Sequence, residues 1–139
     1  MSRLARFGVS MESELLKAFD QLIARKGYAN RSEALRDLVR ELLVRHEWQT
    51  GTTKTCGVLC LVYDHEAHDL AHKLTHLQHE ALNEIVSSLH VHLDEHNCME
   101  IVILRGMPAD LQSLSDRLIS TRGVKYGQLM MATSGARLS

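Results

Sequence analysis

Histidines concentrate in one window of this chain. Eight of its nine histidines lie between His65 and His96, and the run His90-Val91-His92 is followed by Cys98. Imidazole nitrogens together with one thiolate form the ligand set of a first-row transition-metal site. This histidine-rich segment therefore predicts a bound metal ion. The function of that ion must be inferred from the rest of the sequence.

The segment around His90 and His92 has the alternation of a β-strand, in which residues two apart share one face. We expect the apolar residues of this strand and of the next one to pack against helices: Leu89, Val91, Leu93, Met99, Ile101 and Ile103. Cys98 and Glu100 then lie on the histidine face. A hairpin that pairs residue 92 with residue 98 brings His90, His92 and Cys98 together, with Glu100 beside His90. A slip of one residue would separate them.

A fourth ligand is expected from a histidine-rich helix between residues 65 and 85. Its histidines are spaced 3, 4, 4 and 3 residues apart and lie opposite the leucines that must pack on the sheet: His65, His68, His72, His76 and His79. For four of the five, a solvated polar face is the favoured interpretation. We select His79, from a neighbouring chain, as the fourth ligand. Such a set holds zinc in a tetrahedron, or Ni(II) or Cu(II) in a square plane, and spacing does not choose among them.

The histidine window belongs to the second of two predicted domains. The small polar stretch 49–54 is typical of a linker, and it divides the chain into residues 1–48 and residues 55–139. The periodicities after the linker predict a strand, a helix, two strands, a helix and a strand: Thr55–Tyr63, His65–Ile85, Ser88–Leu93, Met99–Leu104, Pro108–Thr121 and Val124–Met131. This βαββαβ order is the ferredoxin-like arrangement, so the fold class is α+β. Cys56 and Cys60 are expected to be small core residues of the first strand.

Residues 1–48 are expected to form one strand and two helices, a β-α-α module. Phe7, Val9 and Met11 alternate with polar or small residues in the strand. A unit of about 50 residues with a single strand cannot close a core alone, so its strand should pair with the same strand of a second chain. The resulting two-stranded ribbon buries the apolar residues and fits the major groove of DNA.

The outward residues of this ribbon are Arg6, Gly8 and Ser10. An arginine there can donate two hydrogen bonds to guanine. The start of the second helix offers free N–H groups to a backbone phosphate, at Asn30, Arg31 and Ser32. The competing interpretation is a dimerisation module with a solvated polar face.

Composition and charge limit the partners and the cellular location that we expect for this protein. The 139 residues have a net charge of −1, which divides into +2 over residues 1–48 (nine Lys/Arg, seven Asp/Glu) and −3 over residues 49–139 (seven and ten). A nucleic-acid partner therefore belongs at the N-terminal end. We expect neither a membrane span nor a secretion signal, because no apolar run is long enough. An odd number of cysteines without a Cys-x2-Cys pair favours the reducing cytoplasm.

Both halves together resemble a known family. The run Gly27-Tyr28-Ala29-Asn30-Arg31-Ser32-Glu33-Ala34 is similar to the ribbon–helix–helix repressors. The second half adds Val62-Tyr63-Asp64-His65-Glu66, Gln78-His79, Leu89-His90-Val91-His92 and Cys98-Met99-Glu100. Over nearly its full length the chain resembles the nickel-responsive ribbon–helix–helix repressors, the NikR family. The spacing 79-90-92-98 coincides with the four nickel ligands of that family.

The resemblance implies one square-planar Ni(II) per chain, held by His90, His92 and Cys98 of one subunit and His79 of another. It implies a homotetramer, a dimer of dimers, with ACT-type regulatory domains at its centre and DNA-binding dimers at either end. Such a protein represses nickel-uptake genes by binding a palindromic operator when nickel is abundant.

The resemblance also assigns supporting residues. Base reading maps to Arg6, Gly8 and Ser10, where Gly8 departs from the longer polar residue expected. Tyr63 and Glu100 are implied to orient ligands. Glu33 and Asp37 match positions that hold a second, weakly bound cation, although at this spacing they are otherwise an ordinary acidic edge of a helix.

Two other classes of protein remain as alternatives. One is a DNA-binding regulator of the same fold that responds to another metal or to a small molecule. The other is a metal-dependent enzyme, which the sequence disfavours. Four protein ligands leave no open position for water in a four-coordinate site, and the chain has no Ser-His-Asp pattern or Gly-rich phosphate loop.

Overall fold

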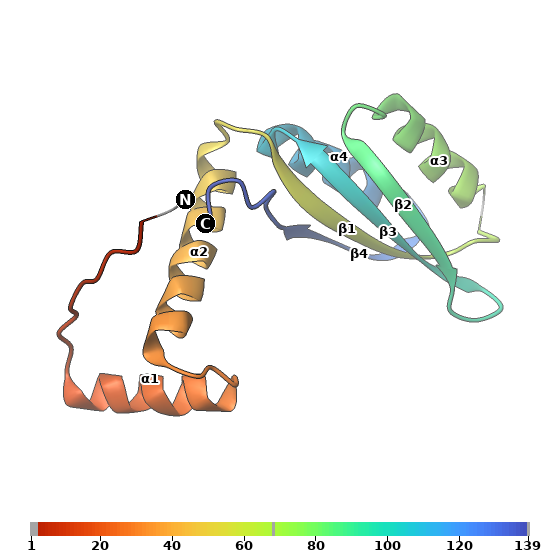
Figure 1. The fold of residues 1–139 in the computed structure, drawn as a ribbon. Coiled ribbons are helices and arrows are strands. Elements are labelled where there is room, and N and C mark those ends of the chain that lie inside the picture. Colours follow the sequence, from red (N-terminus) through yellow and green to blue (C-terminus); the bar gives the residue numbers. More distant parts are fainter. Residues whose placement is uncertain (1–2, 68, 139) are drawn as a thin grey trace. The chain divides into compact units, whose positions relative to one another are not determined.

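The computed structural model describes residues 3–67 and 69–138. The chain divides into two units, one built from residues up to Leu43 with the segment from Gly135 onward, and the other from Val44–Ser134. The division falls inside helix α2 (Arg31–Thr50), which continues through the first two residues of the predicted linker. The chain turns at Gly51, where φ is 62° and a side chain would be strained. Figure 1 shows the elements of each unit.

The first unit contains α1 (Ser13–Arg25) and the start of α2. Gly27, with φ 84°, follows the end of α1, in the conformation that lets a glycine end a helix. Asn30 caps α2 as predicted, because its Oδ1 accepts the backbone N–H of Glu33 at 2.9 Å. Arg31 donates two hydrogen bonds of 2.8 Å to the carboxylate of Asp20, which ties the two helices together.

The expected strand over residues 6–11 is not formed in the single chain. None of the described residues 3–12 joins a strand, and Phe7 and Val9 are 77% and 56% exposed. A strand needs a neighbouring backbone to accept and donate its hydrogen bonds. The structure of one chain offers none, so the predicted ribbon depends on a second chain.

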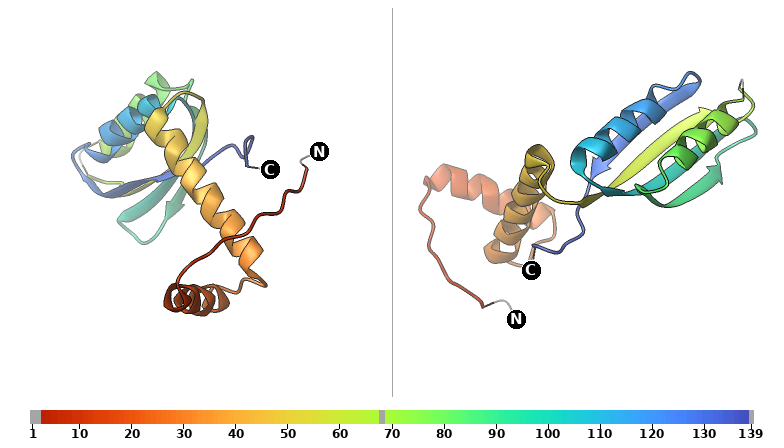
Figure 2. Two further views of the ribbon diagram at one scale, coloured as in Figure 1. Left: turned by 90° about the vertical axis from the view of Figure 1, so that its left-hand side faces the viewer. Right: turned by 90° about the horizontal axis from the view of Figure 1, so that it is seen from above.

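The second unit is a four-stranded antiparallel sheet with two helices, and its βαββαβ order is confirmed. Its elements are β1 (Thr55–Asp64), α3 (Leu70–Glu80), β2 (Ile85–His92), β3 (Asn97–Gly106), α4 (Pro108–Ile119) and β4 (Val124–Met131). The strand order is β2-β3-β1-β4. Figure 2 shows α3 and α4 on the same face of this sheet. The core between helices and sheet is aliphatic and includes Leu59, Leu61, Leu74, Leu104, Leu111 and Leu118.

Helix α3 is shorter than the predicted His65–Ile85. It begins only at Leu70, because Asp69 has φ 57° and ψ 23°, a left-handed conformation that cannot lie inside a right-handed helix. The described residues 65–67 form a turn and Ile85 already belongs to β2, so the predicted helix was too long at both ends. His68 lies outside the described residues.

The prediction of which face of the sheet packs against the helices was wrong. Cys98, Glu100, Val102 and Leu104 are buried beneath the helices, whereas Leu89 and Val91 are 61% and 40% exposed. Cys56 and Cys60 lie on the opposite side of β1 from Leu59 and Leu61 and are half-buried, so they are not core residues. The alternation was right, but in the β2–β3 hairpin the more apolar face is the uncovered one, so composition favoured the wrong face.

We call the uncovered side of the sheet the open face. It consists of Cys56, Val58, Cys60, Leu89, Val91, Met99, Ile101, Ile103, Tyr126 and Met130. Trp48, from the last turn of α2, is 8% exposed and belongs to the core of this second unit, where its Nε1 donates to the carbonyl of Ala132 at 2.8 Å. No described helix is long and apolar enough to cross a membrane.

Candidate metal centre

The predicted register of the β2–β3 hairpin is confirmed. His90 pairs with Glu100, and His92 pairs with Cys98. The rings of His90 and His92 are 5.1 Å apart between centroids. His92 Nδ1 lies 3.4 Å from Cys98 Sγ. Two of the four predicted ligands, His92 and Cys98, therefore lie together on the side of the sheet that the helices cover, and His90 lies beside His92 but is not among the ligand atoms grouped within 4.8 Å in the described residues.

His65 joins this group, although the sequence favoured a solvated position for it. Its Nδ1 lies 3.4 Å from Cys98 Sγ, and the ligand atoms of His65, His92 and Cys98 all lie within 4.8 Å of one another. The signal that could have found it is the sheet order. β1 pairs with β3, with Tyr63 opposite Cys98, so the residue that follows the end of β1 must lie beside the cysteine.

The separations among these atoms suit a shared ion. With bond lengths of about 2.0 Å to nitrogen and 2.3 Å to sulfur, a thiolate and an imidazole on one ion are about 3.0 Å apart at a right angle and about 3.5 Å apart in a tetrahedron. The observed 3.4 Å between Cys98 Sγ and each imidazole lies between these values. The side chains could therefore hold an ion with small adjustments, and the distances do not choose its geometry.

Burial governs the chemistry of the thiol. Cys98 is fully buried, and desolvation raises the pKa of its thiol, with further contributions from the carboxylates of Asp64, Asp94 and Glu100. A metal ligand must be the thiolate. A cation that binds Cys98 must therefore displace a proton, and it would also supply the positive charge that these surroundings lack.

A hydrogen-bond chain connects α3 to the centre. Glu100 is 8% exposed and accepts from Gln78 Nε2 at 2.7 Å and from the Tyr63 hydroxyl at 2.9 Å. The Tyr63 oxygen also lies 3.2 Å from His90 Nδ1. Burial, and then the Glu100 carboxylate, raise the pKa of Tyr63, so its hydroxyl stays protonated. Because that single proton is donated to Glu100, the tyrosine oxygen accepts from His90 Nδ1–H, which leaves His90 Nε2 free for a metal.

His79 lies apart from this group. It is exposed in the last turn of α3 and is not among the grouped ligand atoms of the described residues. In the sequence-based prediction it serves the site of a neighbouring chain, which a single chain does not test.

The predicted cation pair Glu33 and Asp37 is engaged differently. Asp37 accepts from the Tyr28 hydroxyl at 2.8 Å and from Arg40 at 3.0 Å, and the Tyr28 hydrogen bond is the main cause that lowers its pKa. Glu33 is exposed. Within the described part of the chain these two belong to no group of three candidate ligands, and the second cation stays a prediction.

The predicted DNA-contacting residues lie in the first unit. Arg6, Gly8 and Ser10 are exposed along the N-terminal segment. Asn30 is used as the helix cap and Arg31 as the partner of Asp20. Ser32 is exposed in the first turn of α2, where backbone N–H groups lack helical acceptors.

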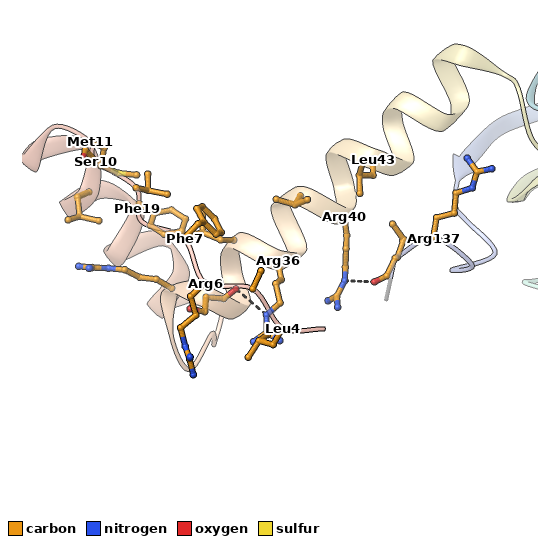
Figure 3. Close-up of a pocket in the computed structure, with 18 residues that line it drawn as sticks. Leu4, Arg6, Phe7, Ser10, Met11, Phe19, Arg36, Arg40, Leu43 and Arg137 are labelled. Carbon is orange, nitrogen blue, oxygen red and sulfur yellow. Dashed lines mark hydrogen bonds between the residues drawn. The ribbon is translucent and has the colours of Figure 1, made fainter. Parts of the chain in front are cut away.

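The N-terminal segment and the two helices of the first unit enclose an apolar hollow of about 1080 Å³, shown in Figure 3. Phe7, Phe19 and Leu43 are among its lining residues. Leu138 also lines it, and its carbonyl accepts from Arg40 Nε at 3.1 Å. Its lining also includes five arginines and two serines, so it is an open hollow with an apolar floor and a charged rim, a surface that another segment or chain is suited to fill.

Comparison with known proteins shows which families and proteins this chain is similar to. A family model described as the NikR C-terminal nickel-binding domain matches residues 56–132, and one described as ribbon–helix–helix protein, CopG family, matches residues 5–46. A protein of Thermococcus kodakarensis, named as a proposed nickel-responsive regulator, is 51% identical over 98% of this chain and 99% of its own length. One from Solidesulfovibrio magneticus with the same name is 53% identical over 99% of both chains.

A solved structure shares the fold of about half of this chain. An uncharacterized protein of Thermotoga maritima superposes with a TM-score of 0.51, at 16% identity, over 56% of this chain and 96% of its own. At that identity the likeness concerns the fold alone.

Proposed function

The chain belongs to the family of nickel-responsive transcriptional regulators, with a ribbon–helix–helix domain followed by a NikR C-terminal nickel-binding domain, and from that premise we propose that it is a cytoplasmic, nickel-dependent repressor. One Ni(II) binds per chain, and the loaded protein binds a palindromic operator that controls nickel-uptake genes. A regulator of this kind is not an enzyme. In this proposal residues 1–48 bind DNA, 49–54 link the domains and 55–139 bind metal and assemble the protein.

The proposed nickel ligands are His90, His92 and Cys98 of one chain and His79 of a neighbouring chain. The observation that carries the proposal is the hairpin register, which places His92 opposite Cys98 and His90 opposite Glu100. A buried thiol with imidazoles beside it suits a borderline cation such as Ni(II). His65 is the competing fourth ligand, because its Nδ1 is already 3.4 Å from Cys98 Sγ within one chain.

Nickel can act on α3 through this chain's own residues. Glu100 joins Gln78 of α3 to Tyr63, and Tyr63 orients His90. When a metal fixes His90, the same hydrogen bonds hold the end of α3, and His79 follows one residue after Gln78. We propose that metal binding thereby orders α3 against a neighbouring chain. Binding linkage then requires operator DNA to tighten nickel binding by the same factor as nickel tightens DNA binding.

The exposed apolar surfaces support a homotetramer. In the first unit, a second chain that pairs with residues 6–11 and fills the apolar hollow would give a ribbon–helix–helix dimer. In the second unit, the open face presents Leu89, Tyr126 and Met130, which are 61%, 53% and 58% exposed. Monomeric proteins rarely leave contiguous apolar patches uncovered. Two different self-associating surfaces on one chain build a dimer of dimers.

The test is fluorescence anisotropy of a labelled palindromic promoter fragment, titrated with protein at fixed salt with and without one equivalent of Ni(II) per chain. We expect tight binding only with nickel. His79→Ala and His65→Ala then separate the two candidate fourth ligands, and we expect only His79→Ala to abolish the nickel effect. Equal DNA affinity with and without nickel would contradict the proposal and favour a regulator that responds to another metal or a small molecule.

A further inference from the structure

The last described residues of the chain belong to the first unit, although β4 before them belongs to the second. We call residues 135–138 the tail. Gly135 has φ 77°, and its carbonyl accepts the backbone N–H of Leu138 at 3.2 Å, so the tail forms a turn. The carbonyl of Leu138 accepts from Arg40 Nε at 3.1 Å. The tail therefore lies against α2, nearly a hundred residues earlier in the sequence.

The chain just before the tail is also held by hydrogen bonds. In the second unit, the carbonyl of Ala132 accepts from Trp48 Nε1 at 2.8 Å, and the Thr133 hydroxyl donates to Glu47 at 3.3 Å. Leu138 follows Thr133 by only five residues. A short tether raises the effective concentration of the segment that it carries. The tail can therefore make a contact with α2 that would be too weak to form between separate molecules.

The tail lies at the hollow that we expect a second chain to fill. Arg137 and Leu138 line this hollow together with Phe7, Val39 and Leu43. Leu138 is half-buried there, and Figure 3 shows the hydrogen bond at Arg40. The tail and a second chain therefore contact the same part of the first unit.

We propose that the tail competes with the second chain for the hollow, so that it opposes formation of the ribbon until it is released. The proposal rests on the proposed ribbon–helix–helix dimer. The contact is suited to release, because Arg40 is exposed and water can replace its hydrogen bond to Leu138. Each dimer requires two tails to leave. A bound tail favoured only about twofold over a free one would therefore raise the apparent dissociation constant of the dimer about ninefold.

Hydrogen exchange of the amides of residues 6–11, followed against protein concentration in metal-free buffer, tests the competition. These residues join no strand in the single chain, and their amides become protected when the ribbon pairs. We expect a variant that ends at Ser134 to reach half-protection at about tenfold lower protein concentration than wild type. Leu138→Ser should shift the midpoint in the same direction by less, because it keeps the carbonyl that Arg40 binds.

Ala136→Ser is the matched control, since Ala136 is exposed in the same tail and does not line the hollow. We expect it to behave as wild type does. An equal or higher midpoint in both the shortened chain and Leu138→Ser would overturn the competition. No protection of residues 6–11 at any concentration, in any variant, would instead overturn the ribbon dimer and the role of the tail with it. Far-UV circular dichroism checks the fold of the shortened chain, and Leu138→Ser tests the proposal at full length.

Discussion

The two units of this chain differ in where their apolar side chains are buried. In the second unit Leu59, Leu61 and Leu104 are fully buried between sheet and helices. In the first unit Phe7 and Leu42 are 77% and 62% exposed, and the described N-terminal residues form no strand. The second unit therefore has a core of its own, whereas the first leaves its apolar side chains exposed in the single chain. The proposed metal site therefore belongs to the unit with its own core, and the proposed DNA-binding surface belongs to the unit that we expect to be completed by a second chain.

The largest effect expected from this contrast is on stability. Leu61→Ala removes a fully buried side chain and should lower the free energy of unfolding by about 3 kcal/mol, independently of protein concentration. Leu42→Ala, at an exposed position, should instead raise the concentration at which the chain dimerises. Urea unfolding at two protein concentrations measures both. A Leu61→Ala loss that changes with concentration would contradict the difference between the units.

Cys98→Ala should separate metal response from DNA affinity. Because Cys98 is buried beside two imidazoles, its loss removes the thiolate, and we expect nickel affinity to fall at least about 100-fold, near the upper end of what changes around a metal site cost. Metal-free DNA binding should not change, since that surface lies in the other unit. Nickel titration and anisotropy on the same sample check this. Retained nickel-dependent DNA binding would exclude Cys98 as a ligand.

Gln78→Leu should weaken the response without removing a ligand. Its Nε2 donates to Glu100 at 2.7 Å, so the substitution leaves the buried carboxylate with one donor fewer and frees the end of α3. We expect nickel affinity to fall about tenfold, in the range found for groups that orient ligands. Gln78→Glu is less suitable, since it adds a second carboxylate. Nickel affinity is measured by competition with a chelator. An unchanged nickel affinity would show that Gln78 does not connect α3 to the metal centre.

Asn30→Ala tests a local feature of the DNA-binding unit. Its Oδ1 caps α2 through the Glu33 N–H at 2.9 Å, and loss of such a cap costs about 1 kcal/mol. We expect thermal stability to fall accordingly, with nickel affinity unchanged. Asn30→Ser keeps an oxygen at this position and should restore most of the loss. Equal losses in both variants would show that the cap is not the cause.

The smallest expected effect is on stability at low pH. Hydrogen bonds from the Asn97 side chain, and then from the backbone of Asn97 and His96, lower the pKa of Asp94 from 3.8 to about 2 in the β2–β3 turn. A lowered folded-state pKa contributes stability above the unfolded value, and this is lost as pH falls from about 4 toward 2. The melting temperatures of wild type and Asp94→Ala should therefore differ at pH 5 and converge near pH 2. A constant difference would contradict this role.

Much of the second unit could be predicted because its strands and helices follow from patterns among residues that are close in the sequence. The alternation around His90 and His92 gave the hairpin and, with Cys98, its register. Helix α3 was predicted too long, because the histidine spacing continues past the left-handed Asp69, which no periodicity reveals. His65 was missed for a different reason. Its place beside Cys98 comes from the pairing of β1 with β3, which are more than thirty residues apart.

By itself, the sequence determined the order of helices and strands in the second unit, the parity of each of its strands and the residue types that suit a transition metal. These follow from backbone periodicity and side-chain chemistry, which act locally. Only the tertiary structure decided which face of the sheet the helices cover, so that Cys98 and Glu100 are buried and Cys60 faces outward. In the β2–β3 hairpin local hydrophobicity favours the face that the structure leaves uncovered, so it could not give the right choice. The choice depends on how distant segments pack, and packing is a property of the whole fold.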